Sequence, residues 1–374
     1  MIDLSEFYPL DRLPKTEVIS VMVDGTRYTA IERIQVRAGF NEAARAFEFT
    51  VAAELGASAT NAIFHAGAEI DIYATGDLLL SGYVDQKRPH MSARRAEIVV
   101  TGRSKGSDLI DSDIDHPTGY FESKSAIEIA QELAKGYSAK IVSKLNLKKL
   151  PQHICTPGSS IFREVEMIMR RHGATMTALP NGDIEVTKPE GKRHAGGLFE
   201  GQNILVGNAD HNWSNRYSKY NYRGQRTVGR QSKRLHMVAS AKDGSVKRKR
   251  VKSQINESDA DDGDLKERAK TRALRSAGSA LKSTISVPGF RDEAGAIWTP
   301  GYLIWEESPF LDIAQDMLIE SIDFSQSEQG TIALLSMVDP KSYASAGAGG
   351  GKGGKSGKEW SQDVEIDNQV PEDL

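Results

Sequence analysis

Residues 78–112 read LLLSGYVDQKRPHMSARRAEIVVTGRSKGSDLIDS, and this stretch decides the class of fold. Two apolar segments flank a polar segment that contains Pro89, which is typical of two strands joined by a turn. A charged segment punctuated by glycines, residues 101–111, follows at once. We therefore ask whether 101–111 is a phosphate-binding loop or a structural corner.

The segment 101–111, TGRSKGSDLID, lacks the glycine spacing of the nucleotide-binding motifs. We expect Gly102 to end a strand and Arg103 to pair with a nearby carboxylate, Asp108 or Asp111. This interpretation makes the segment a structural corner rather than a ligand site.

The composition indicates a water-soluble globular protein. Of its 374 residues 39% are hydrophobic and 26% charged, and the net charge of -3 does not indicate a nucleic-acid binder. No stretch approaches the roughly 18 apolar residues of a membrane-spanning segment, and the N-terminus does not resemble a secretory signal. The single cysteine, Cys155, excludes an intrachain disulfide and any multi-cysteine zinc site. We expect a protein that is made in the cytoplasm and needs no oxidation to fold.

Short alternating apolar runs predict strands through residues 18–104. The strongest turn signal is Asp24-Gly25, and further turns are expected at Gly76 and around Pro89. Strands at this spacing indicate a small barrel or sandwich.

Residues 112–190 are predicted to be a mixed α/β segment. One helix is expected in 122–137, with Ser123 or Ser125 as its N-cap, and another in 159–173. The segment 174–189 is typical of a hairpin that turns at Asn181-Gly182.

Strands resume after residue 190, interrupted by a predicted helix over 264–281. A weak internal echo links the two strand regions. Each has a strand, a loop with Asn and Arg and a strand (32–52 and 204–224), and later a strand, a turn and a strand. If the echo is real, the chain carries two similar β-domains.

We therefore predict an α+β protein that is mainly β, with two similar small β-barrel domains and a mixed α/β segment between them. The expected divisions are an N-terminal arm (1–17), a first β-barrel domain (18–111), the mixed α/β domain (112–190), a second β-barrel domain with a charged insertion and helix at about 240–282 (191–341), a Gly/Lys-rich linker (342–358) and an acidic tail (359–374).

Candidate chemical sites each have a simpler structural interpretation. The linker matches the Walker A pattern at Gly349, Gly354, Lys355 and Ser356, but its Gly-rich flanks cannot hold the backbone amides in place for a phosphate. The carboxylates Glu306 and Glu307 are one of many such pairs in a chain with 51 acids.

The same holds for the histidines and serines of the α/β segment. His153 and Cys155 are spaced like two metal ligands, yet no second pair lies nearby. His172 ends a predicted helix and complements its negative end, while Ser159 and Ser160 are at a helix start and are expected to cap it. We therefore predict no catalytic, cofactor-binding or metal-binding residues, and no cofactor.

Residues 216–252 hold 13 Lys or Arg and one acid, Asp243, and residues 257–267 carry six acids. We favour a solvated loop whose bases pair with those acids. Binding to phosphate backbones or to an acidic protein surface is the alternative.

In this order the elements resemble the Mu-like phage tail protein family, the baseplate hub proteins of contractile-tailed phages, which are related in fold to the hub part of secretion-system spikes. The resemblance is carried by SGYVDQ with EIVVTGRSKGSDLIDS (81–86 and 97–112), the helix 125–142, the segment 158–188 and the C-terminal series 285–340. It spans roughly residues 18–342, and residues 1–17, 240–264 and the C-terminal tail depart from it.

The resemblance implies a non-enzymatic homotrimer that forms a ring with two similar β-barrel domains from each chain. The ring would join a sixfold tail tube to a threefold spike in the virion baseplate and let DNA pass after spike release. Implied partners are the tail tube protein or a tube-end adapter, the central spike protein, and a baseplate wedge or tape-measure protein. Assembly would take place in the bacterial host cytoplasm. The alternatives are a tail-associated peptidoglycan hydrolase and a nucleic-acid-binding module that uses 216–252.

Two further hypotheses concern charge and the tail. We expect the ring's lumen to be neutral or acidic, because a basic wall would retain DNA. We expect the linker to tether the acidic tail so that Trp360 and Val364 reach a neighbouring protein.

Overall fold

The computed structural model describes residues 17–53, 63–93, 95–189, 191–224, 237–255, 262–328, 330–343 and 364–367. The chain forms two compact units. Unit 1 comprises Met1–Gly207, Ile285–Ile304 and Ile319–Ser336, and unit 2 comprises Asn208–Thr284, Trp305–Leu318 and Met337–Leu374.

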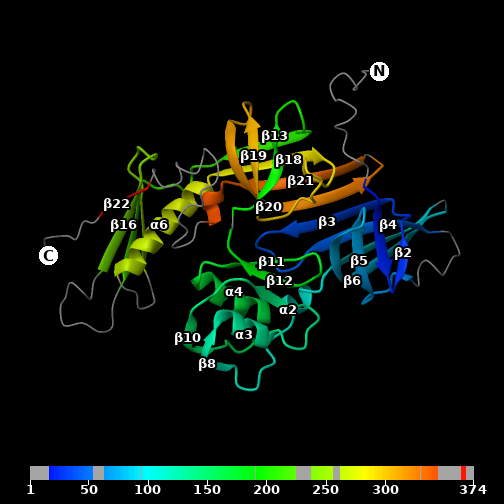
Figure 1. Cartoon of the computed structure of the whole chain (residues 1–374), viewed down its shortest axis with the longest axis horizontal. Helices are drawn as coiled ribbons and strands as arrows, with labels where there is room; N and C mark the ends of the chain where they lie inside the picture. Colours follow the sequence, from blue (N-terminus) through cyan, green and yellow to red (C-terminus); the bar gives the residue numbers. More distant parts are fainter. Residues whose placement is uncertain are drawn as a thin grey trace. The chain divides into compact units, whose positions relative to one another are not determined.

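Unit 1 begins with a group of antiparallel strands (Figure 1). They are β1 (Ile19–Val23), β2 (Thr26–Tyr28), β3 (Arg33–Gly39), β4 (Ala46–Ala53), β5 (Glu69–Ala74), β6 (Asp77–Met91) and β7 (Ala96–Ser104). The turn between β1 and β2 falls at Asp24 and Gly25, both with positive φ, as the sequence predicts. In β3 the side chains alternate between exposed and buried, so that Ile34 and Val36 face the core.

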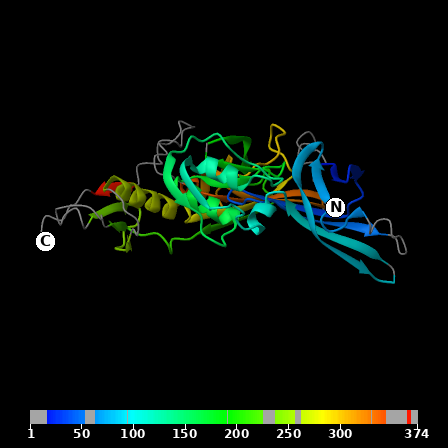
Figure 2. The same ribbon diagram turned by 90° about the horizontal axis from the view of Figure 1, so that it is seen from below.

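The β6–β7 hairpin corrects two expectations. Pro89 does not mark a turn, because β6 continues through it to Met91 and pairs it with Ile98 of β7. An edge strand tolerates proline where the missing N–H faces away from the ladder. Gly102 does not end a strand either, since β7 continues to Ser104. Figure 2 shows the hairpin extending beyond its neighbouring strands.

The mixed α/β segment follows as α2 (Ser107–Asp111), β8 (Tyr120–Ser125), α3 (Ala126–Leu133), β9 (Ile141–Ser143), β10 (Lys149–Ile154), α4 (Ile161–Arg171), β11 (Thr175–Ala178) and β12 (Ile184–Thr187). Both predicted helices and the hairpin at Asn181-Gly182 are confirmed. Ser125 caps α3 and forms a capping box with Glu128, and the apolar faces of α3 and α4 pack into one core.

The rest of the described chain is again mainly strands. These elements are β13 (Arg193–Phe199), β14 (Val206–His211), β15 (Lys219–Gly224), β16 (Met237–Asp243), β17 (Val251–Ile255), α6 (Asp262–Gly278), β18 (Leu281–Pro288), β19 (Leu303–Ser308), β20 (Ile313–Ser327), β21 (Gly330–Val338), the 3-10 helix η3 (Pro340–Tyr343) and β22 (Val364–Asp367). In unit 2, α6 packs on the sheet β17-β15-β16-β22 through buried Tyr220, Ala241, Ala269 and Ala273.

The strand order occurs twice along the chain. The first strands pair in the order β3-β4-β7-β6-β5-β1, and the later ones in the order β14-β18-β21-β20-β19-β13. Each strand of the first set has a counterpart in the same chain order. The echo in the sequence was therefore correct for β3 and β14, but the counterpart of β4 is β18 rather than β15. Strands β15–β17 and α6 are inserted between β14 and β18.

The fold is mainly β with few helices, as predicted. Among the described residues, no helix is both long and apolar enough to cross a membrane.

Arg45 connects the first strands to the α/β segment in unit 1. Its buried guanidinium donates hydrogen bonds to the carbonyl oxygens of Leu79 (2.7 Å) and Ala178 (3.1 Å). Burial lowers the pKa of Arg45 to about 10, which leaves the side chain cationic at neutral pH.

We predict that Arg45→Ala destabilises the protein by about 2–4 kcal/mol, because two buried carbonyls lose their donor. The free energy of unfolding in urea measures this. Arg33→Ala is the matched control, since Arg33 is exposed and its pairing with Glu48 is long, at 3.8 Å. Equal, small losses in both variants would contradict the assigned role.

Candidate functional site

The segment 101–111 is the structural corner that the sequence indicates. Arg103 donates to Asp111 (2.7 Å) and also to Asp85 on β6 (2.7 Å). Its hydrogen bonds lower the pKa of Asp111. Asp108 does not bond to Arg103, and burial together with Asp111 raises the pKa of its carboxyl. Sequence reasoning missed Asp85 because the bulge that brings it to Arg103 is a property of strand pairing.

His153, Cys155 and Glu164 form a buried cluster in the α/β segment. His153 Nε2 lies 3.0 Å from Glu164 Oε1, and Glu164 Oε2 accepts a hydrogen bond from the Thr156 amide at 3.1 Å. One ligand-type atom from each residue lies within 4.8 Å of the other two, and these atoms are of the types that coordinate metal ions. Because the carboxylate is already hydrogen-bonded through both oxygens, we interpret the cluster as a structural one.

We predict that native Cys155 is nearly inert. Burial, with a contribution from Glu164, raises the pKa of its thiol to about 11. At pH 8 it should react with a thiol reagent at least about a hundredfold more slowly than in the same chain unfolded in guanidinium. Similar rates in the native and unfolded protein would contradict this environment.

Of the two predictions for the ends of α4, the one for the N-terminus is confirmed and the one for the C-terminus is not. Ser160 caps the helix by accepting from the Arg163 amide, as expected. His172 is the C-cap residue, but burial and the nearby cations Lys188 and Arg171 lower the pKa of its imidazole. A lowered pKa favours the neutral ring, so a charge that complements the helix end is not the role of His172.

Glu306 and Glu307 point to opposite faces of β19, so they cannot act as a carboxylate pair. Glu306 is fully buried and accepts a hydrogen bond from Ser283 at 2.6 Å. Glu307 is exposed and bonds to the Trp305 indole. Burial raises the pKa of Glu306.

We predict that Glu306→Gln gains stability relative to the parent protein as the pH rises above about 4.5, the ordinary pKa of a glutamate. A raised folded-state pKa means that the native protein binds more protons than the unfolded one, so ionisation removes stability as the pH rises. Urea unfolding from pH 4.5 to 8 measures the difference. Exposed Glu307→Gln is the control, and a flat difference for Glu306→Gln would contradict the assignment.

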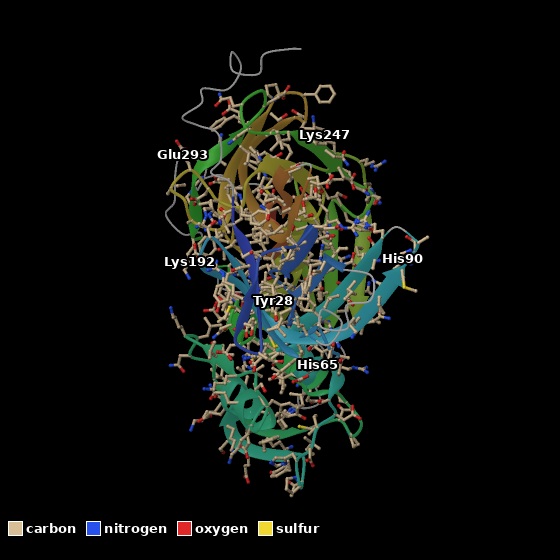
Figure 3. The ribbon with its side chains drawn as sticks, turned by 90° about the vertical axis from the view of Figure 1, so that its right-hand side faces the viewer. Tyr28, His65, His90, Lys192, Lys247 and Glu293 are labelled. Carbon is tan, nitrogen blue, oxygen red and sulfur yellow. The ribbon has the colours of Figure 1, made fainter. Side chains whose placement is uncertain are left out.

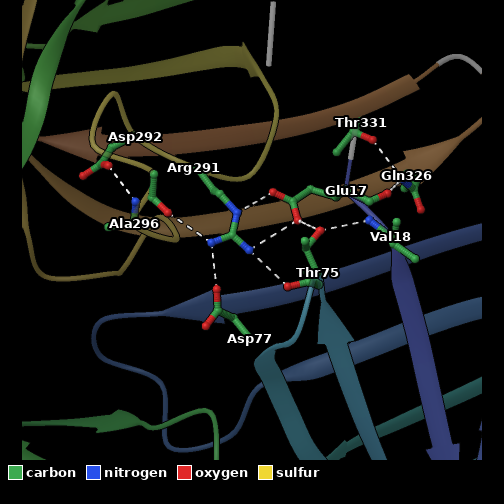
Figure 4. A network of polar contacts seen from close by, with 11 residues as sticks. Glu17, Val18, Thr75, Asp77, Arg291, Asp292, Ala296, Gln326 and Thr331 are labelled. Carbon is green, nitrogen blue, oxygen red and sulfur yellow. Dashed lines mark hydrogen bonds and ion pairs between the residues drawn. The ribbon is translucent and has the colours of Figure 1, made fainter. Parts of the chain in front are cut away.

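An ion-pair network in unit 1 connects segments that are far apart in the sequence (Figure 4). Arg291 donates to Glu17 (2.6 Å) and Asp77 (2.7 Å), and its pKa is raised chiefly by Glu17. Gln326 on β20 bonds to the Glu17 carbonyl (2.8 Å) and to Thr331 on β21 (2.9 Å). The network joins the root of the N-terminal arm to both sets of strands, and no sequence pattern signalled it.

A pocket of about 650 Å³ in unit 1 lies beside this network and is lined by Arg291, Asp292, His194 and Trp298, among others. His194 is held by Asp292 at 2.8 Å and accepts from the Thr299 amide through its other ring nitrogen. Burial alone would raise the pKa of Asp292, but hydrogen bonds from His194 and from two backbone amides lower it overall. With both ring nitrogens occupied, His194 is positioned for packing rather than for proton transfer.

The described part of the basic stretch is largely engaged with its own unit. Arg216 pairs with Asp243 (3.0 Å) and stacks on Trp213 (4.4 Å). Arg250 and Lys252 lie over the Tyr217 ring, at 4.9 and 5.7 Å. The sequence did not place the Tyr217 ring beside Arg250 and Lys252, because the pairing of β15 with β17 brings them together. The acids at 257–261 lie outside the described residues.

The candidates in the C-terminal linker and tail are the Walker A match, Trp360 and Val364. The Walker A match and Trp360 lie outside the described residues. Val364, which was expected on a neighbouring protein, lies in β22, and β22 pairs with β16 of the same chain.

Comparison with known proteins connects this architecture to phage tails. Residues 18–104 match the family "Mu phage baseplate assembly protein GpP-like, N-terminal", and residues 263–346 match "Mu phage baseplate assembly protein GpP, fourth domain". The chain is 21% identical over 326 residues to the baseplate hub protein gp44 of Escherichia phage Mu, covering 84% of this chain and 85% of gp44.

Two solved structures share the fold. The 43 kDa tail protein of prophage MuSo2 from Shewanella oneidensis has a TM-score of 0.79 at 21% identity, over 87% of this chain and 99% of that one. The E. coli c3393 protein, a component of the type VI secretion system, has a TM-score of 0.53 at 9% identity, over 85% and 76%.

The molecule is thus a structural protein of a phage tail baseplate, located in the virion. Both matched regions are those of Mu phage baseplate assembly proteins, and the resemblance to the Mu phage baseplate hub family seen in the sequence is confirmed. This family is structural rather than enzymatic.

Proposed function

We propose that this hub protein assembles as a homotrimeric ring in which every chain supplies two similar β-barrel domains, 18–111 and 191–341, with 112–190 between them. Three chains with two domains each give six matching positions. A sixfold tail tube, or its end adapter, docks on one face of the ring and a threefold spike on the other. DNA passes through the lumen after spike release.

The repeated strand order is the observation that carries this proposal. A protein that joins sixfold to threefold symmetry needs two equivalent modules per chain, and the orders β3-β4-β7-β6-β5-β1 and β14-β18-β21-β20-β19-β13 supply them. The family match at 18–104 spans the first set of strands, and the match at 263–346 covers β18–β21 of the second set.

We predict that the purified protein has three times the mass of one chain in light scattering or mass photometry. Large obligate interfaces should keep this mass constant over a wide range of concentration. A monodisperse monomer at high concentration, unchanged when the spike protein is added, would contradict the proposal.

A further inference from the structure

The two sets of strands correspond residue by residue, because matched backbone hydrogen bonds fix their register. The Glu32 amide donates to the Thr50 carbonyl (3.0 Å), and the Leu205 amide donates to the Ser286 carbonyl (2.8 Å). β14 therefore corresponds to β3 with Leu205 in the position of Glu32, and Asp210 in that of Arg37.

A second pair of matched hydrogen bonds fixes the register in which the long strands β6 and β20 correspond. Val84 exchanges hydrogen bonds with Gly67 and Ala68, and Ile319 does the same with Gly301 and Tyr302. β6 and β20 are each 15 residues long, and their hairpin partners β7 and β21 each have nine. Counting outward from Val84 and Ile319, residues 86–91 of β6 correspond to residues 321–326 of β20.

The corresponding strands differ in what covers them. Residues 321–326 of β20 pair with β3, from Ser321 opposite Gly39 to Gln326 opposite Ile34. Within the described residues, 86–91 of β6 pair only with β7, and β14 is the terminal strand of its sheet. The junction between β20 and β3 is therefore closed within the chain. Among the described residues, the corresponding edges of β6 and β14 are open.

We propose that the open edge of β6, residues 86–91, pairs antiparallel with the open edge of β14 in a second copy of this chain. The inference rests on the proposed trimer. In the register of β20 and β3, Gln86 lies opposite Asn212 of the next copy, Arg88 opposite Asp210, and His90 opposite Asn208. The ring then has six like junctions, three within chains and three between them.

Charge supports this register. At the closed junction Arg37 on β3 pairs with Asp323 on β20 at 3.1 Å. The corresponding residues at the open edges are Asp210 on β14 and Arg88 on β6, which form the same pair with the signs exchanged. Arg88 contacts Glu48 of its own chain at 3.2 Å with half its side chain exposed, and no described residue forms an ion pair with Asp210.

Aromatic packing gives independent support. Gly301 has φ of +84°, and a Cβ there would lie 2.4 Å from the Phe40 ring, so the ring packs directly on the glycine. Gly67, its counterpart, also has φ of +84° but open space above it. Trp213 takes the position of Phe40 and is 46% exposed. At the proposed junction Trp213 covers Gly67 of the neighbouring copy.

Exposed apolar side chains also gather at these edges. Met91 is 76% exposed on β6, and Val206 is 68% exposed on β14 (Figure 3 labels the adjacent His90). Pro89, in the position of Phe324, has no N–H and accepts only, so this junction has one hydrogen bond fewer than the closed one.

Cysteine cross-linking tests the register. His90 and Asn208 correspond to Ser325 and Gln35, a pair without mutual backbone hydrogen bonds, where Cα atoms are about 4.5 Å apart and a disulfide fits. A chain with His90→Cys is mixed with a chain with Asn208→Cys and oxidised. We expect covalent dimers only in the mixture. The control mixture pairs His90→Cys with Ile154→Cys, which is exposed on the α/β segment.

Charge exchange provides a second readout. Arg88→Asp and Asp210→Arg should each weaken assembly about tenfold or more, measured as the concentration of half-dissociation, and the double variant should recover to within about threefold of the parent. Cross-linking no stronger than the control, or additive losses in the double variant, overturns the junction. If the parent is still a trimer by mass, the proposed function stands without this junction; if it is a monomer, both fail.

Discussion

The ladder between β20 and β3 is the interaction on which the rest of the structure depends. It pairs residues 321–326 with residues 34–39, segments from opposite ends of the chain. Ile34 and Val36 on one strand and Ile322 and Phe324 on the other are buried. Pairing of such distant segments carries a high loop-closure cost, which burial of these apolar side chains offsets.

Polar contacts support this ladder within unit 1. Glu17, Arg291 and Gln326 fasten strands of the two sets to one another within unit 1. His194 with Asp292, and His153 with Glu164, use their hydrogen-bonding atoms on neighbouring protein groups. Because these side chains are already hydrogen-bonded to protein groups, we interpret them as holding neighbouring segments in place.

Local features of the fold could be read from the sequence, and non-local ones could not. The α3 cap at Ser125 and the turn at Asp24-Gly25 each depend on a few adjacent residues, and both were predicted. Pro89 was misjudged as a turn because a long edge strand tolerates proline, and that edge is visible only in the sheet. The function followed from the family resemblance, whereas the partners of the buried polar side chains became known only from the structure.

The partners of buried charges were the hardest to predict. Asp85 for Arg103 and Glu164 for His153 come from elements that pairing or packing brings together. The internal repeat could be recognised only in part from the sequence. The insertion of β15–β17 and α6 separates β14 from β18, which is the true counterpart of β4. The sequence did not suggest that Arg88 and Asp210 form a pair. That inference depends on the ion pair between the corresponding residues Arg37 and Asp323.

The central claim is that each chain presents two equivalent sets of strands around one axis. A cryo-EM density map of the assembled protein tests it most directly. We expect six copies of the repeated strand order around a threefold axis, with a continuous strand ladder across every boundary between copies. A map with only one set of strands per chain facing the axis, or with gaps between chains at β6 and β14, would contradict it.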